Sequence, residues 1–112
     1  MNKLIIDIAK DFSVTPGGRT SEDGDYHGQR FREEYLIPAF DKGYDIIVIV
    51  INGIEGLPTS FRDEAFGGLA RHYRDNGGFT GEEILEKIEF VSDEHPYLPP
   101  KIIALIQKYG SK

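Results

Sequence analysis

The feature that most constrains the fold is a run of six β-branched apolar residues, Ile46–Ile51, between Asp45 and Asn52-Gly53. An uninterrupted run of this kind is typical of a central strand covered on both faces, the usual setting in a parallel sheet. It is far too short to cross a bilayer, which takes about 20 residues. We therefore expect residues 45–51 to form the central strand of a buried sheet.

Strand patterns and helix patterns alternate on both sides of this run. The first helix contains Pro38, which is expected to kink or end it. Before the buried run we expect a strand at Leu4–Ile8, a polar glycine-rich loop at Ser13–Gly28 and a helix from Gln29 to about Phe40. After it we expect a helix that follows Leu57-Pro58, with Phe61, Ala65, Leu69 and Tyr73 on one face, and a short helix opened by the capping box Thr80–Glu83. A strand at Ile88–Val91 and a last helix after Pro99-Pro100 complete the chain. This order predicts an α/β fold: three or four strands, mostly parallel or mixed, packed by about four helices.

Length and composition narrow the classes of protein. A chain of 112 residues forms one domain, so we treat 1–112 as a single unit. The net charge of −6 disfavours nucleic acid or an anionic membrane as the main partner. The absence of cysteine excludes disulfides and thiolate chemistry. Asp7 interrupts any signal-peptide apolar region, so we expect a cytoplasmic protein.

The most distinctive segment is residues 52–69, which leaves the buried strand and opens a helix. Ser60 and Asp63 have the spacing of a capping box, in which the hydroxyl accepts a free backbone N–H of the first turn. Asp63 and Glu64 lie near the positive end of the helix dipole. Gly67-Gly68 inside a helix costs about 1 kcal/mol per residue against alanine, which indicates close approach of another backbone or of a partner.

Several segments together resemble the STAS-like domain family of small bacterial domains. They are Asp11-Phe12-Ser13 after the first strand, Pro16-Gly17-Gly18-Arg19, Gly28-x-x-Phe31-Arg32-Glu33, and Ser60-Phe61-x-Asp63-Glu64-Ala65-Phe66-Gly67-Gly68-Leu69 after the buried strand. This resemblance covers about three quarters of the chain.

The resemblance implies a regulatory module like the anti-sigma-factor antagonists. In those proteins a histidine-kinase-like ATPase phosphorylates a serine at the start of the helix after a central strand, and the phosphate releases the partner. Ser60 is the best match to that serine and Thr59 the next, although the antagonists place aspartate before a serine pair and this chain has Leu57-Pro58. The resemblance thus implies an ATPase of that type as partner, with no catalytic residue and no cofactor. The expected contact residues are Gly53, Leu57, Phe61, Asp63, Glu64, Gly67 and Gly68.

Other interpretations stay open beside this one. Ser60 and Thr59 also suit a plain helix cap, and Gly67 and Gly68 suit internal packing. The turn Gly17-Gly18-Arg19 offers amides and a guanidinium to an anion, although ordinary turn chemistry fits it as well. His27, His72 and His95 lack the spacing of a helical zinc site, so no metal is expected.

Three functions follow from these features. The leading one is a non-enzymatic regulatory interaction module. The second is a small phosphate- or nucleotide-binding domain or enzyme that uses His27, Arg19 and the glycine-rich loop. The third is a homo-oligomeric structural subunit, in which the glycine-bearing helix packs in a homodimer.

Overall fold

A three-stranded parallel sheet organises the chain. The computed structural model describes residues 2–111. Its strands are β1 (Lys3–Asp7), β2 (Ile46–Val50) and β3 (Ile88–Val91), in the order β1-β2-β3. Both neighbouring pairs are parallel, with Ile6 opposite Ile49 and Ile49 opposite Phe90. The predicted α/β class and the central position of the Ile/Val strand are confirmed.

Two long helices connect the strands. The first covers residues 28–41 and joins α1 (Gly28–Phe31), a π-helical turn (Arg32–Leu36) and α2 (Ile37–Asp41). The second covers residues 59–76 and joins α3 (Thr59–Arg62), a π-helical turn (Asp63–Gly67) and α4 (Gly68–Asn76). The remaining segments are a π-helical turn at Ile8–Phe12, a 3₁₀ turn at Ser21–Asp23, α5 (Gly81–Lys87) and α6 (Leu98–Gly110). The predicted capping box at Thr80 and Glu83 opens α5.

Pro38 does not end the first helix, contrary to one of the expected outcomes. The helix runs on to Asp41, and a π-helical turn lies directly before the proline. In this turn the Ile37 N–H donates to the carbonyl of Arg32, five residues back. The backbone hydrogen bonds of the helix are therefore already offset by one residue before Pro38, which has no N–H to donate. The helix continues past the proline for this reason.

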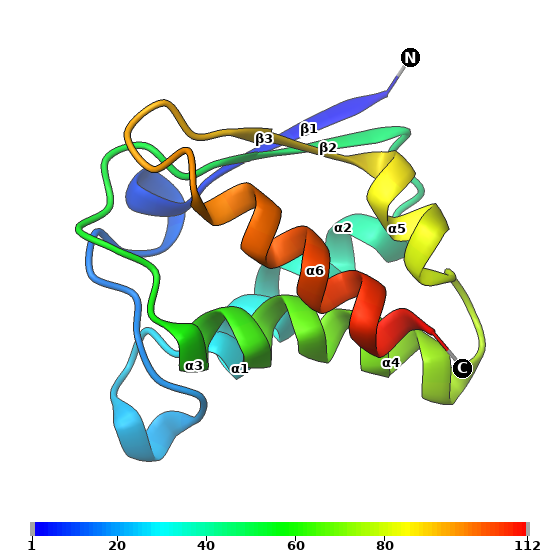
Figure 1. Cartoon of the computed structure of the whole chain (residues 1–112), viewed down its shortest axis with the longest axis horizontal. Coiled ribbons are helices and arrows are strands. Elements are labelled where there is room, and N and C mark those ends of the chain that lie inside the picture. Colours follow the sequence, from blue (N-terminus) through cyan, green and yellow to red (C-terminus); the bar gives the residue numbers. More distant parts are fainter. Residues whose placement is uncertain (1, 112) are drawn as a thin grey trace.

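All the helices lie on one face of the sheet (Figure 1). The expectation that the central strand is covered on both faces is therefore wrong. On the open face, Ile5 is 60% exposed and Val91 is 37% exposed, whereas Val48 between the edge strands is only 8% exposed. Val48 is buried mainly because it has a strand on each side, since its register partners are Ile5 and Glu89.

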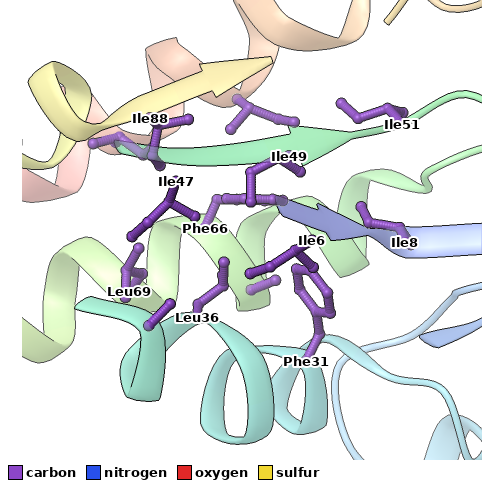
Figure 2. Packing of buried hydrophobic residues seen from close by; sticks show 14 of the residues in the cluster. Ile6, Ile8, Phe31, Leu36, Ile47, Ile49, Ile51, Phe66, Leu69 and Ile88 are labelled. Carbon is purple, nitrogen blue, oxygen red and sulfur yellow. The ribbon is translucent and has the colours of Figure 1, made fainter. Parts of the chain in front are cut away.

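The core fills the space between the sheet and the two long helices. Figure 2 shows Ile6, Ile47 and Ile49 of the sheet pointing toward the helices. The helical residues predicted by their spacing, Phe61, Ala65, Leu69 and Tyr73, are all buried. Phe12, Phe31 and Phe61 pack ring against ring next to them. Burial of each such side chain stabilises the fold by about 1.5–3 kcal/mol, and this term fixes the helices on the sheet.

The polar loop between the first strand and the first helix is held by its own hydrogen bonds. The Gly17 N–H donates to the carbonyl of Tyr26 at 2.9 Å, and the Gly28 N–H donates to the carbonyl of Gly18 at 3.0 Å. Gly18 has a φ of +85°, a conformation that glycine adopts without strain. The loop thereby brings Arg19 to the start of the second long helix.

Candidate functional site

The start of helix 59–76 lies beyond the carboxyl end of β2, where the sequence places its candidate residues. The connection between β2 and α3 is tied to the loop after β3. The Gly53 N–H donates to the Glu94 carboxylate at 2.8 Å, and the Glu94 N–H donates to the Asn52 side-chain oxygen at 3.1 Å. Gly53 is exposed and has a φ of +90°. These bonds fix the approach to Thr59 and Ser60.

Neither hydroxyl caps the helix, so the predicted capping box of Ser60 and Asp63 is wrong. The residue before the helix is Pro58, and no side chain caps this end. Thr59 is exposed, and its Oγ1 accepts a hydrogen bond from the Arg62 guanidinium at 3.1 Å. Ser60 is half-buried, and its hydroxyl accepts no capping hydrogen bond from the first turn. Because the helix begins at Thr59, two residues earlier than the box requires, Asp63 is too far along it to complete a box.

Asp63 instead joins the helix to the polar loop. Its carboxylate lies 2.5 Å from the Arg19 guanidinium and 4.0 Å from that of Arg71. Burial raises the pKa of Asp63, but its hydrogen bonds to Arg19 and Tyr109 and the charge of Arg71 outweigh burial and hold the pKa below its usual range. The carboxylate is thus ionised and paired within the chain.

Glu64 pairs with the first long helix. Its carboxylate lies 2.9 Å from the Arg32 guanidinium, which also donates to the backbone carbonyl of Glu64 at 2.5 Å. Gly68 makes this contact possible, because a Cβ there would lie 2.3 Å from an Arg32 nitrogen. The close approach at Gly67 and Gly68 therefore comes from side chains of the same chain, and not from another backbone as one of the expectations had it.

Four of the predicted contact residues have little surface to offer a partner. Leu57, Phe61, Gly67 and Gly68 are buried. A Cβ at Gly67 would lie 3.0 Å from the Tyr109 ring of α6. These four residues therefore pack below the surface at the helix start, whereas Gly53 and Thr59 are exposed on that surface.

Three donors of the Gly17-Gly18-Arg19 turn, the Gly17 N–H among them, are used within the chain. The Arg19 guanidinium bonds to Asp63, and the backbone N–H of Arg19 donates to the Asp23 carboxylate at 2.9 Å. That bond and a second one from the Thr20 N–H hold the pKa of Asp23 below its usual range. The hydrogen bonds of this turn thus favour the interpretation as ordinary turn chemistry.

The histidines are dispersed rather than gathered. His27 is buried at the start of α1, where its Nδ1 accepts from the Arg30 N–H at 3.1 Å. The His95 Nε2 lies 3.0 Å from the carbonyl oxygen of Ile54. Within residues 2–111, no group of three histidine, aspartate or glutamate side chains is placed to hold a metal ion.

The opposite flank of helix 59–76 carries residues that the sequence analysis missed. A groove of about 280 Å³ lies between α3 and α6 and is lined by Thr59, Arg62, Lys101, Ala104, Leu105 and Lys108. The Arg62 guanidinium donates to the carbonyl of Leu57 as well as to Thr59. Its Nε is buried and has no hydrogen-bond partner in the part of the chain that the structure describes. The signal in the sequence was the spacing of residues 101, 104, 105 and 108, which places two lysines and two apolar residues on one helix face.

These features define a class: a small α/β domain with a parallel sheet, helices on one face and a hydroxyl-bearing helix start after the central strand. The family model of the STAS-like domain of unknown function (DUF4325) matches residues 27–98. The chain belongs to this family, which confirms the resemblance. No curated protein and no solved structure matches the chain. Among residues 2–111, no helix is both long and apolar enough to span a membrane.

Proposed function

We propose that this STAS-like domain is a regulatory protein-interaction module, which phosphorylation of Thr59 or Ser60 switches. The observation that carries the proposal is the helix start after β2, where two neighbouring hydroxyls are not used as caps. The likeness of the family to the anti-sigma-factor antagonists supports a protein partner, with a histidine-kinase-like ATPase as the candidate.

The physical chemistry of the helix start suits a phosphate. A phosphorylated hydroxyl carries about −1.5 to −2 charges at neutral pH. The first turn of a helix has free N–H groups and the positive end of the dipole, and both favour an anion. A phosphate on Thr59 would also lie beside a guanidinium, because Arg62 already donates to the Thr59 Oγ1.

The two hydroxyls differ in accessibility. Thr59 is exposed at the first position of the helix, whereas Ser60 is half-buried at the second. Exposure favours Thr59 as a kinase substrate, and the likeness to the antagonists favours Ser60. Separate variants therefore have to be made.

The test is recovery of the tagged full chain from its native host, with its intact mass and any phosphorylated residue recorded. Wild type is compared with Thr59→Glu and Ser60→Glu, and with Thr59→Ala and Ser60→Ala as matched controls. We expect one glutamate variant to lose a protein that wild type and the corresponding alanine variant retain. Equal recovery by all five proteins, with no phosphate on either residue, would overturn the proposal.

A second candidate is a homo-oligomeric subunit, and the open face of the sheet favours it. Ile5 and Val91 are exposed there, whereas parallel sheets are normally covered on both faces. Sedimentation over a wide range of protein concentrations tests this candidate. A rise in mass with concentration that Ile5→Lys abolishes would support it, and a constant monomer mass would remove it.

A further inference from the structure

The groove between α3 and α6 has an apolar floor and a basic rim. Lys101, Ala104, Leu105 and Lys108 are spaced i, i+3, i+4 and i+7 on α6, so they form one stripe along the helix. Thr59 and Arg62 form the facing wall. Ala104 is exposed and Leu105 half-buried, which leaves apolar surface accessible between the two lysines.

The charge of this groove is the opposite of that of the whole chain. Its lining holds three cations and no carboxylate, while the chain has a net charge of −6. Within residues 2–111, no carboxylate lies within 4.0 Å of a charged nitrogen of Arg62, Lys101 or Lys108. The Lys101 and Lys108 ammonium groups instead lie over the rings of Tyr97 and Tyr109, at 5.9 and 5.1 Å from the ring centres. The two lysines are exposed and are therefore available to negative groups from outside, beside the guanidinium of Arg62.

We propose that the groove binds an acidic amphipathic helix of a partner protein. An apolar stripe between two helices is the geometry in which a third helix buries its own apolar face. Lys101 and Lys108 are two turns apart, about 10 Å along α6. A partner helix with leucines on one face and acidic residues two turns apart beside them matches both the stripe and the charges.

This inference rests on the proposed function and adds the chemistry of the partner and a physical reason for its release. Thr59 is part of the groove wall, and its Oγ1 lies 3.1 Å from an Arg62 nitrogen. A phosphate on Thr59 would bring about −1.5 to −2 charges among the three cations. It would neutralise the groups that attract the acidic helix, so phosphorylation and partner binding compete for the same charges.

The direct test uses the full chain labelled with ¹⁵N and a synthetic helical peptide as probe. The peptide has about 14 residues, with leucines on one face and glutamates flanking them, which gives about four helical turns. We expect the amide signals of Thr59, Arg62, Lys101, Ala104 and Leu105 to shift on titration. A peptide of the same composition in scrambled order and one with lysine in place of glutamate serve as controls and should leave these signals in place. Absence of shifts at the groove with the acidic peptide, or equal shifts with the scrambled one, would overturn the inference.

Charge reversal provides the matched comparison. The double variant Lys101→Glu/Lys108→Glu should lower the affinity for the acidic peptide at least about tenfold. The double variant Lys10→Glu/Lys42→Glu changes the net charge equally at exposed positions outside the groove, and it should bind like wild type. Thermal melts of both variants establish that they fold. Equal weakening in both would show an effect of overall charge and would overturn the site.

A Thr59→Glu variant separates the two proposals. If the peptide binds it as tightly as wild type while the Lys101→Glu/Lys108→Glu variant fails to bind, the groove stands and the competition with a phosphate on Thr59 falls. The other outcome is that the host partner binds the Lys101→Glu/Lys108→Glu variant unchanged but no longer binds Thr59→Glu or Ser60→Glu. This result would support the regulatory function and would exclude the groove as the binding site.

Discussion

The two flanks of helix 59–76 use charge in different ways. On the flank that faces the polar loop and helix 28–41, each cation has a carboxylate: Arg19 pairs with Asp63, and Arg32 pairs with Glu64. On the flank that faces α6, the cations of the groove have no carboxylate within 4.0 Å in residues 2–111. We expect the paired charges to stabilise the fold. Of the groove cations, Arg62 donates within the chain to Leu57 and Thr59, whereas the exposed Lys101 and Lys108 are the ones that we expect to contribute little to stability and to act on another molecule.

The largest effect is expected at Gly28, where the paired flank brings the backbones of the two long helices together. A Cβ at this position would lie 2.8 Å from the carbonyl oxygen of Phe61 and 2.9 Å from the Glu64 Cβ. Because a backbone atom cannot move aside cheaply, Gly28→Ala should lower the free energy of unfolding by about 3 kcal/mol. Chemical denaturation measures this loss. Gly56→Ala is the control, since no atom lies within 4 Å of its added carbon, and it should change stability by less than about 0.5 kcal/mol. Equal stability of both variants would show that the two long helices are not in close contact at Gly28.

The next largest effect is expected at the ion pair of Arg32 and Glu64. The two side chains are only 14% and 20% exposed, so Arg32→Leu leaves a carboxylate largely withdrawn from water without its partner. We expect a loss of about 2 kcal/mol in the free energy of unfolding, measured by denaturation.

Arg30→Leu is the matched control for Arg32→Leu, because Arg30 pairs with Glu34 on the exposed side of the same helix. Water screens that pair, so its removal should have a much smaller effect than removal of Arg32. A similar loss in both variants would contradict the distinction between buried and exposed pairs.

A pH-dependent effect is expected at Asp63. Its pKa in the folded chain is lowered from the ordinary value, so its ionised form favours folding. This contribution is complete above the unfolded pKa of about 3.9 and is lost as pH falls through the lower, folded pKa. Asp63→Asn should therefore be less stable than wild type at neutral pH, and the difference should shrink below about pH 4. Thermal melts from pH 7 to pH 2.5 measure it, and a difference that does not change with pH would show that the Asp63 charge is not its cause.

The sequence predicted the framework better than the site. The Ile/Val run gave the central strand and the helical spacing of Phe61, Ala65, Leu69 and Tyr73 gave a buried face, because periodicity reports directly which residues meet the core. The open face of the sheet was missed because β2 carries an apolar residue there as well: Val48 is buried between its two neighbouring strands, so the run lacks the alternation that an open face normally produces.

At the site, local rules were overridden by contacts between distant segments. Ser60 and Asp63 had the spacing of a capping box, but the helix begins earlier, at Thr59, and Arg19, 44 residues before Asp63, pairs with its carboxylate. The groove depends on Arg62 and Lys101 lying on two different helices, which no local pattern contains. The spacing along α6 was visible in the sequence, but which helix it faced was not.

The smallest effect is expected at the unpaired flank, and it tests the comparison most directly. Lys101 and Lys108 have no carboxylate within 4.0 Å among residues 2–111, and both are exposed. The double variant Lys101→Ala/Lys108→Ala should therefore change the free energy of unfolding by less than about 0.5 kcal/mol, in contrast to Arg32→Leu. Denaturation of the two variants side by side measures the contrast, and a loss above about 1 kcal/mol would show that the two lysines stabilise the fold. If stability is unchanged while binding of the acidic peptide is weakened, the two flanks are separable: one set of charges holds the helix in place, and the other is available for a partner.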